Sequence, residues 1–357
     1  MKFAFVITNL AGGGAEKVVL TLASGLAGRG HDVDVVLLER RIEHKIPEGI
    51  TPTCLTEKAP RGWLGKRYLA WRLARYLAQP VDLVISALPF ANEVAILANL
   101  PHHWCRIDNT LGSEIDKLAL TNPDKARRRL RRYRTLYNAR PLIAISNGMI
   151  DDLRTRIGVT GRIEKISNPF DFDAIRRDAT MNFVPERPYV IHIGRFNTQK
   201  RHDLLLDAWV RVATDRELVL LTAANPALQA MIDERGLAHR VRIAGFQTNP
   251  YPWIANADLL VLSSDHEGLS NVLIEALGCG TPVVSTDCPS GPREILAALP
   301  ECLVPCGNAE RLAAAMTHCL ATPPNPSCAD LSAYDIHGVL DAYERLAAEC
   351  HTQALLG

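Results

Sequence analysis

The chain has 357 residues, of which 47% are hydrophobic and 22% are charged, a composition typical of a globular protein with two or three domains. It has no apolar run near the roughly 20 residues that cross a bilayer, and no small-residue cleavage site follows the short apolar run at its N-terminus. For these two reasons we expect a cytoplasmic protein. The formal net charge of +1 does not suggest a general polyanion binder, and no nucleic-acid recognition motif is present, so we expect no nucleic acid as a partner.

The charge is divided unevenly along the chain. Residues 1–170 carry a net charge of +10 and residues 171–357 carry −9, which together give the +1 of the whole chain. The basic half points to a local anionic partner. The nine cysteines include no C-x2-C pair, so the sequence predicts neither a zinc ribbon nor a disulfide framework.

Both halves of the chain alternate strand-like and helix-like segments. Short β-branched runs predict buried strands at residues 3–7, 33–38, 81–86, 141–146, 189–194, 218–223, 241–245, 257–264 and 282–286. The alternation predicts an α/β fold with two doubly wound Rossmann-like domains that face each other across a cleft. A break near residues 166–175 places these domains at 1–167 and 168–340. Residues 341–357 are expected to form a helical tail that packs back toward the first domain.

A glycine turn follows the first predicted strand, in AGGGAEK at residues 11–17. Glycines at this position let the backbone approach a phosphate closely, and a helix through about Gly28 would follow. A dinucleotide site would need G-x-G-x-x-G, but counted from Gly12 the last position is Lys17. Glu39, at the end of the next strand, would suit a ribose, which keeps an NAD(P)-dependent oxidoreductase open as an alternative.

Two basic stretches supply much of the charge of the first half. Residues 61–79 interleave five cations with four aromatic residues, and residues 125–134 carry seven cations in ten positions. Cations beside interfacial aromatics suit an anionic membrane surface. The alternative is a pair of solvated arginine-rich helices that pack their aromatic side chains inward.

The segment GRFNTQK, residues 194–200, directly follows a predicted strand of the second half. It places Arg195 and Lys200 at the carboxyl end of that strand, where doubly wound sheets bind their ligands. Two cations there would neutralise a diphosphate and stabilise it as a leaving group. The spacing alone is also compatible with the alternative that Arg195 and Lys200 are ordinary surface residues with no ligand.

A second segment, EGLSNVLIEALGCG, begins in the loop after the strand 257–264 and continues as a helix from Ser270 to Leu277. Ser270 is a candidate N-cap, and the free amides of the first turn would form an anion site. Glu275 is either part of a solvated stripe or a buried carboxylate that needs hydrogen-bond donors such as sugar hydroxyls.

Taken together, the motifs GGAE, GR-x4-K, EG-x6-E and G-x-PVV resemble those of the family-4 glycosyltransferases, which have the GT-B fold. The resemblance covers most of the chain and is strongest from residue 189 to 296. It implies retaining transfer of a sugar from a nucleotide-sugar donor, with no cofactor and no catalytic metal. The acidic triplets at 32–34 and 171–173 begin a strand and follow the interdomain link, so we read neither as a metal site.

The resemblance also assigns residues to roles. Glu275 would bind the ribose, and Glu267, as a predicted catalytic residue, the donor sugar. Asp108 stands where the family often has a histidine and is the second predicted catalytic residue, on the acceptor side. The residues that would contact the donor through side chain or main chain are Gly13, Gly14, Arg195, Lys200, Leu269, Ser270, Asn271 and Glu275.

We therefore predict a hexosyltransferase that builds a surface glycan such as lipopolysaccharide, using a UDP-sugar, with a UDP-N-acetylhexosamine preferred. The acceptor would be lipid-linked, the linkage α, and the enzyme peripheral at the inner face of the cytoplasmic membrane. Proton transfer to the leaving diphosphate and a covalent glycosyl–enzyme route are both open mechanisms. The alternative functions are a sugar-nucleotide epimerase, an oxidoreductase and a non-catalytic glycan- or membrane-binding protein.

Overall fold

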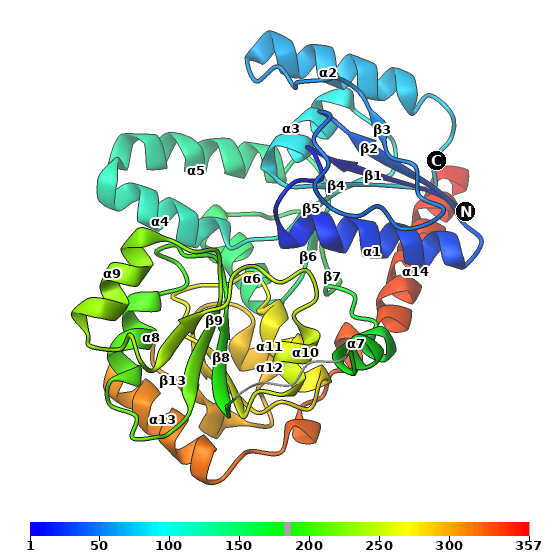
Figure 1. Cartoon of the computed structure of the whole chain (residues 1–357). Helices are drawn as coiled ribbons and strands as arrows, with labels where there is room; N and C mark the ends of the chain where they lie inside the picture. Colours follow the sequence, from blue (N-terminus) through cyan, green and yellow to red (C-terminus); the bar gives the residue numbers. More distant parts are fainter. Residues whose placement is uncertain (182–186, 357) are drawn as a thin grey trace. The chain divides into compact units, whose positions relative to one another are not determined.

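A computed structural model describes residues 1–181 and 187–356. The chain divides into two compact units, unit 1 with Met1–Pro169 and Ile336–Gly357, and unit 2 with Phe170–Asp335. Each unit contains one parallel sheet with helices on both faces (Figure 1), so the predicted pair of doubly wound α/β domains is confirmed. The sequence predicts divisions at residues 168 and 341, and the contacts place them at 170 and 336.

Unit 1 is built on a seven-stranded sheet in the order β3-β2-β1-β4-β5-β6-β7. Its strands are β1 Lys2–Ile7, β2 Asp32–Leu37, β3 Thr53–Cys54, β4 Leu83–Ala87, β5 His103–Ile107, β6 Leu142–Ala144 and β7 Ile163–Lys165. Its helices are α1 Gly14–Gly28, α2 Trp63–Tyr76, α3 Pro89–Ala98, α4 Leu111–Thr121, α5 Pro123–Tyr137, α6 Asn147–Asp151, a π-helix Asp152–Ile157 and α14 Ile336–Leu356.

The core of unit 1 lies on both faces of this sheet. Apolar residues of α1 and α14 pack with β1 on one face, while those of α2 and α3 pack on the other. Strands buried on both faces read as nearly continuous apolar runs, as FAFVI does in β1. This is why the strands with short β-branched runs were predictable.

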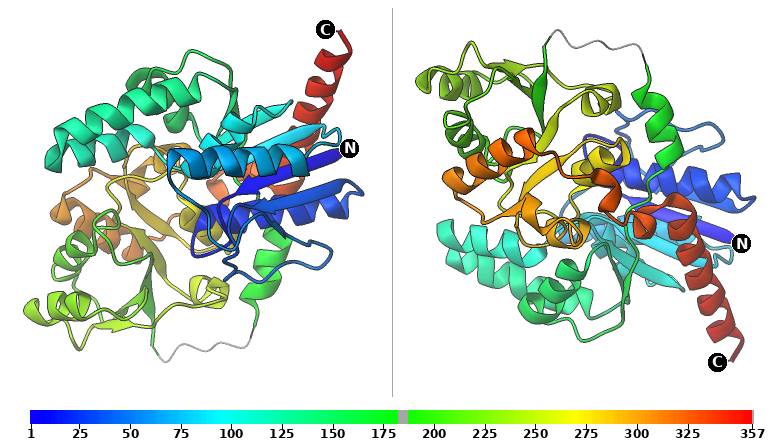
Figure 2. Two further views of the ribbon diagram at one scale, coloured as in Figure 1. Left: turned by 90° about the horizontal axis from the view of Figure 1, so that it is seen from above. Right: turned by 90° about the horizontal axis from the view of Figure 1, so that it is seen from below.

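The C-terminal helix α14 belongs to unit 1, although it follows unit 2 in the sequence. The ring of Tyr343 lies 6.4 Å from that of Phe5 in β1, and Arg29 at the end of α1 forms an ion pair of 2.6 Å with Asp341. A Cβ atom at Gly25 would lie 2.8 Å from a methyl carbon of Leu340, so α1 and α14 are in close contact. The views in Figure 2 show α14 near the N-terminal strand.

Unit 2 is built on a six-stranded sheet in the order β10-β9-β8-β11-β12-β13. Its strands are β8 Tyr189–Ile193, β9 Glu217–Leu221, β10 Val241–Ile243, β11 Leu259–Leu262, β12 Val283–Thr286 and β13 Leu303–Val304. Its α-helices are α7 Phe172–Ala179, α8 His202–Trp209, α9 Pro226–Glu234, α10 Tyr251–Ala255, α11 Asn271–Gly278, α12 Pro292–Ile295 and α13 Ala309–Ala321.

The strand order reverses once in each sheet. In unit 1 the reversal lies between β1 and β4, and in unit 2 between β8 and β11. At a reversal point, the loops that follow the two neighbouring strands run in opposite directions, which leaves room for a ligand at the carboxyl ends of these strands. The loop before α8 and the loop before α11 therefore meet at the reversal point of unit 2.

Candidate active site

The reversal point of unit 2 brings two predicted site residues into contact. Lys200, in the loop after β8, places its Nζ 2.8 Å from Oε1 of Glu267, in the loop after β11. Their side chains are only 17% and 9% exposed. β8 and β11 are neighbouring parallel strands, so the loops that follow them lie at the same edge of the sheet. This is how two residues 67 positions apart in the sequence form an ion pair.

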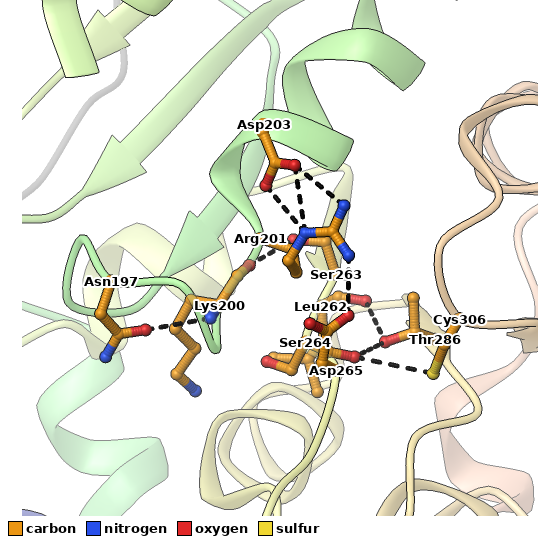
Figure 3. A network of polar contacts seen from close by, with 10 residues as sticks. All are labelled: Asn197, Lys200, Arg201, Asp203, Leu262, Ser263, Ser264, Asp265, Thr286 and Cys306. Carbon is orange, nitrogen blue, oxygen red and sulfur yellow. Dashed lines mark hydrogen bonds and ion pairs between the residues drawn. The ribbon is translucent and has the colours of Figure 1, made fainter. Parts of the chain in front are cut away.

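Hydrogen bonds to the main chain hold the Lys200 loop against the end of β11 (Figure 3). The amide of Lys200 donates to the side chain of Asn197 at 3.0 Å, and its carbonyl accepts from the Ser263 hydroxyl at 2.8 Å. The side-chain amide of Gln199 donates to the His266 carbonyl at 2.8 Å. These bonds fix the backbone from which the Lys200 side chain extends.

The arginines of this loop differ in availability. Arg201 binds Asp203 and Asp265, each at 2.9 Å, and these contacts raise the pKa of its guanidinium (Figure 3). Arg195 is exposed, and among the described residues it has no hydrogen-bond or ion-pair partner. Arg195 is therefore the cation that can bind an incoming anion without losing an existing contact.

The first turn of α11 offers further anion-binding groups. Ser270 occupies the N-cap position, but its hydroxyl makes no cap bond, which corrects the side-chain N-cap expected from the sequence. The buried Oγ of Ser270, and the amides of Leu269 and Ser270, have no partner among the described residues. The amide of Asn271 instead donates to the carbonyl of Leu269 at 2.7 Å. Free amides at a helix N-terminus bind anions.

Glu275 lies in α11 and is 9% exposed, so it is not part of a solvated stripe. The hydroxyl of Tyr251 in α10 lies 3.4 Å from its Oε1. A nearly buried carboxylate with two acceptor oxygens can bind a pair of ligand hydroxyl groups. The two glutamates of the EG-x6-E motif are thus both nearly buried in unit 2, one paired with a cation and one beside a tyrosine.

Two site residues escaped the sequence analysis. The hydroxyl of Ser290 donates to the carbonyl of Gly268 at 2.7 Å, and Gly291 packs against the backbone of Ser270. Gly291 has φ of +98°, and a Cβ there would lie 3.0 Å from the Ser270 amide nitrogen. The S-G-P run before α12 was the available signal, since serine, glycine and proline mark a turn before a helix.

Replacing Gly291 by alanine is expected to lower the free energy of unfolding by about 1–2 kcal/mol because of the left-handed φ. It should also weaken binding of the nucleotide-sugar donor that the sequence motifs predict, because the new methyl group crowds the Ser270 amide. Gly280→Ala is the matched control, with φ of +82° and no atom within 4 Å of the added Cβ. Denaturant unfolding and UDP titration of both variants test this. Equal nucleotide affinities in the two variants would contradict the role given to the Ser270 amide.

A buried histidine pair lies behind the Lys200 loop. The rings of His192 and His202 are 4.8 Å apart and edge-to-face, and Nδ1 of His192 lies 2.9 Å from the Val261 carbonyl. Neither ring nitrogen of His202 has a partner among the described residues. Burial and the charge of Lys200 lower the pKa of His202 to about 4. His202 is therefore neutral in the folded chain near neutral pH.

The stability of the protein is expected to fall as the pH is lowered from about 6.5 to about 4. In this window an unfolded histidine binds a proton and the folded His202 does not, so acid favours the unfolded state. In the His202→Phe variant, the urea concentration at the midpoint of unfolding should decrease less over this pH range than it does in the wild type. His239→Phe, which changes an exposed histidine, should behave like the wild type. Identical pH profiles for all three proteins would exclude this source of acid sensitivity.

In unit 1, the predicted glycine loop follows β1. Gly12 has φ of +94°, Gly13 is the N-cap of α1, and the Glu16 side chain lies where a Cβ of Gly13 would be. Glu39 accepts hydrogen bonds from Asn9 at 2.7 Å and Arg61 at 3.0 Å, so its carboxylate is already bound. This arrangement does not favour Glu39 as a ribose ligand.

Asp108 lies just after β5 in unit 1. Its Oδ1 accepts from Nε of Arg106 at 2.9 Å, and its Oδ2 is buried without a partner among the described residues. Arg106 is fully buried and also donates to the Tyr343 hydroxyl of α14 at 3.0 Å and to Asn168. The helix that returns from the end of the chain thus helps to position Asp108.

Among the described residues, no group of three or more His, Cys, Asp or Glu side chains is arranged to hold a metal ion. Asp32 and Asp34 instead contact Lys2 at 3.4 and 3.3 Å. Asp171 caps α7 by accepting from the Ala174 amide at 2.8 Å.

Two family models match the chain. Residues 12–174 match "Glycosyltransferase Family 4", and residues 187–322 match "Glycosyl transferases group 1". Among curated proteins, the chain is 29% identical over 316 residues to an enzyme of Campylobacter jejuni, with 82% of this chain and 83% of the relative covered. That enzyme is named N-acetylgalactosamine-N,N'-diacetylbacillosaminyl-diphospho-undecaprenol 4-alpha-N-acetylgalactosaminyltransferase.

Further similarities are partial in sequence or confined to the fold. The lipopolysaccharide 1,6-galactosyltransferase of Salmonella typhimurium is 30% identical over 168 residues, 43% of this chain and 45% of that protein. The structure of Anabaena HepE with UDP and glucose superposes with a TM-score of 0.78 at 20% identity, covering 98% of this chain and 100% of that one. The lipopolysaccharide outer core galactosyltransferase WaaB superposes with a TM-score of 0.71 at 18% identity, covering 98% and 99%.

Proposed function

Because this chain belongs to the family-4 glycosyltransferases and is an enzyme that transfers a sugar from a nucleotide-sugar donor, we propose that it acts with retention of anomeric configuration. The donor we propose is a UDP-sugar such as a UDP-N-acetylhexosamine, and the acceptor a lipid-linked or surface glycan that receives an α linkage. The GT-B fold shared with the solved structures is the frame for this reaction.

The observation that carries the proposal is the clustering of charged and polar groups at the reversal point of unit 2. The Lys200–Glu267 pair, exposed Arg195 and the free amides before α11 are placed for a diphosphate and the sugar attached to it. Glu275 offers two acceptor oxygens for ribose hydroxyls. This is the donor site we propose, with Gly13 and Gly14 of unit 1 as further predicted donor contacts.

In the reaction we propose, the bond between the donor sugar and the diphosphate breaks with its electron pair going to the diphosphate oxygen. Arg195, Lys200 and the free amides before α11 stabilise the charge that develops there. The acceptor hydroxyl forms the new bond on the same face, and its proton passes to the departing diphosphate. Glu267 is bound to Lys200 and so is better placed to hold the donor sugar than to act as a covalent nucleophile.

The relatives support the choice of donor and acceptor. The Campylobacter enzyme is named as an α-N-acetylgalactosaminyltransferase acting on a diphospho-undecaprenol-linked sugar, and the HepE structure contains UDP. The epimerase alternative would convert donor without acceptor. The oxidoreductase alternative would need a nucleotide cofactor on the glycine loop of unit 1, where Glu39 is already bound to Asn9 and Arg61.

We also propose that unit 1 binds an anionic membrane surface. No helix among the described residues is long and apolar enough to span a bilayer. On α2, however, Trp63, Leu64 and Trp71 are 68%, 74% and 57% exposed, so the aromatic residues of stretch 61–79 do not all pack inward. Arg67 and Arg75 lie against the rings of Trp63 and Trp71, and cations near such a surface contribute about 1 kcal/mol each. On α5, most cations of stretch 125–134 are exposed.

The protein is expected to float with vesicles that contain anionic lipid at low salt and to dissociate as salt is raised. The combined variant Trp63→Ser, Leu64→Ser and Trp71→Ser should lose most of this binding, because it removes the apolar anchors and keeps every charge. Leu120→Ser, a single change at an exposed leucine of α4, is the control for general surface polarity. Failure of the wild type to float at low salt would remove the membrane proposal.

The experiment that tests the proposed activity measures nucleotide release from a panel of UDP-, GDP- and ADP-sugars. Each donor is used with and without a lipid-linked acceptor extract, and NAD(P)H binding is measured alongside. We expect release from a UDP-sugar that depends on acceptor and gives an α-linked product. Release without acceptor would favour an epimerase or hydrolase, a β-linked product would exclude retention, and tight NAD(P)H binding without any release would overturn the proposal.

A further inference from the structure

Arg201 joins the two loops that carry the Lys200–Glu267 pair. Its guanidinium donates to Asp203 in the first turn of α8, with Nε 2.9 Å from Oδ1 and Nη2 2.9 Å from Oδ2. Through Nη1 it also donates to Oδ1 of Asp265, in the loop after β11, at 2.9 Å. Figure 3 shows the guanidinium between these two carboxylates. The side chain of Arg201 thus bridges the loop after β8 and the loop after β11.

The backbone of Arg201 has a conformation that residues other than glycine rarely adopt. Arg201 is the N-cap residue of α8, and its φ of +49° and ψ of +52° lie in the left-handed region. Glycine adopts this conformation without steric cost, whereas arginine does not. Such strain persists where surrounding contacts hold the residue in place, often at functional sites. The turn alone therefore favours glycine, and the arginine is explained by the contacts of its side chain.

The bridge acts on the residues that carry the ion pair of the site. Lys200 directly precedes Arg201 in the loop after β8. Asp265 stands two positions before Glu267 in the loop after β11, and its amide donates to the carbonyl of Gln199 at 2.9 Å. The guanidinium bridge and this backbone bond together hold the two main chains from which the side chains of Lys200 and Glu267 extend.

Arg201 is not placed to bind the donor itself. Its charge is compensated by two carboxylates, and its hydrogen bonds to Asp203 and Asp265 raise the pKa of its guanidinium. A turn toward a diphosphate would break these charge-assisted bonds. The side chains of Arg201 and Asp265 are 28% and 32% exposed, so solvent screens their ion pair and its contribution to overall stability is small. Arg201 therefore acts through the residues that it holds.

We propose that Arg201 is a positioning residue of the donor site, which holds Lys200 where its ammonium group stabilises the departing diphosphate. The inference rests on the proposed function, since it concerns the same reaction. A group that stabilises a transition state has to be held near its productive position, and a displacement of about 1 Å can lower the rate by about 100-fold. Because Lys200 is still present without Arg201, the expected loss is smaller than for removal of Lys200.

Arg201→Gly separates positioning from stability. Glycine relieves the left-handed backbone and removes the bridge to Asp265, so the variant is expected to unfold at a urea concentration close to that of the wild type. Its kcat for acceptor-dependent release of UDP should fall about tenfold, while KM for the donor and the affinity for UDP change much less. Arg201→Ala keeps the strained backbone and should be less stable than Arg201→Gly, with the same loss of kcat.

A double-mutant cycle and a matched control complete the test. Asp265→Asn should lower kcat as Arg201→Gly does, and the two changes combined should cause no further loss, because either one breaks the bridge. Arg216→Ala is the control. Arg216 is 29% exposed and donates to Asp258 at 2.8 Å, at the opposite end of β11, so the variant loses a similar ion pair away from the site and should keep wild-type kcat.

UDP binding and release by the wild type separate this inference from the proposed function. With both present, a folded Arg201→Gly variant with wild-type kcat, losses that multiply in the double variant, or an equal loss in Arg216→Ala would overturn the positioning inference alone. Absence of UDP binding and release in the wild type would instead overturn the proposed function. If Arg201→Gly does not fold, Asp265→Asn decides: a lower kcat with unchanged UDP affinity supports the positioning inference, and wild-type kcat overturns it.

Discussion

Lys200→Ala is expected to lower the turnover number by about 10²–10³-fold, which is the typical effect of removing one group that stabilises developing charge. Lys200 Nζ lies at the reversal point of unit 2, 2.8 Å from Glu267 and in the same loop as Arg195. If the diphosphate departs there, loss of this cation raises the energy of the transition state more than that of the bound donor. The effect should therefore appear mainly in kcat, measured as acceptor-dependent release of UDP.

The same substitution is expected to destabilise the fold, because it leaves the nearly buried Glu267 carboxylate without its cation. Breaking one side of a buried ion pair costs about 3 kcal/mol or more. Adding Glu267→Gln should restore part of this stability but no activity, which separates the two roles of Lys200. Arg311→Ala, at an exposed cation of unit 2, is the control for net charge. Near wild-type turnover by a folded Lys200→Ala variant would refute the role of Lys200 in catalysis.

Glu275→Ala is expected to weaken binding of UDP and of the UDP-sugar by about 10–100-fold. One hydrogen bond to a charged group contributes about 1.5–3 kcal/mol, and this effect corresponds to the loss of one bond from a ribose hydroxyl to the 9% exposed Glu275. Calorimetric titration with UDP measures this effect directly. The loss should affect UDP more than free diphosphate, since only the nucleoside part contacts Glu275 in our proposal.

Two comparisons sharpen this prediction. Tyr251→Phe removes a hydroxyl that lies 3.4 Å from Glu275, so a much smaller loss of UDP affinity is expected. Glu234→Ala changes an exposed glutamate at the end of α9 and should leave binding unchanged. A folded Glu275→Ala variant with wild-type affinity for UDP and wild-type turnover would show that Glu275 is not a donor ligand.

The parallel strands with apolar sequences were predictable because both of their faces are buried. The runs FAFVI in β1 and LLVL in β11 contain no polar residue, so periodicity and composition agree. The central strand β5, with the sequence HWCRI, was missed for the opposite reason. His103 and Arg106 are buried there because Ser86, Asp108, Asn168 and Tyr343 satisfy them, and all four partners lie in other elements or loops.

The short strands β3, β7 and β13 were also absent from the sequence prediction. β3 and β13 contain two residues each and β7 contains three, which is too short for a pattern of alternation to be recognised. Their positions are set by pairing with neighbouring strands, as when Val36 and Leu37 of β2 pair with Thr53 and Cys54. Pairing of this kind is a tertiary property that one segment does not encode alone.

The candidate site was predictable as a set of motifs but not as a set of contacts. The sequence places Lys200 and Glu267 at the carboxyl ends of two strands, yet only the strand order makes β8 and β11 neighbours and allows the 2.8 Å ion pair. Likewise, the support of α11 by Ser290 and Gly291 depends on a loop that is close only in the folded chain. The hydroxyl of Ser270, expected to cap α11, has no partner among the described residues.

The most direct test of the donor site is a crystal structure of the protein with UDP bound. The account predicts the diphosphate within hydrogen-bond distance of Arg195 and of the Leu269 and Ser270 amides, with the ribose hydroxyls on Glu275. It would be contradicted by a nucleotide whose diphosphate lies on the glycine loop at Gly12 of unit 1 while the unit 2 site contains only solvent.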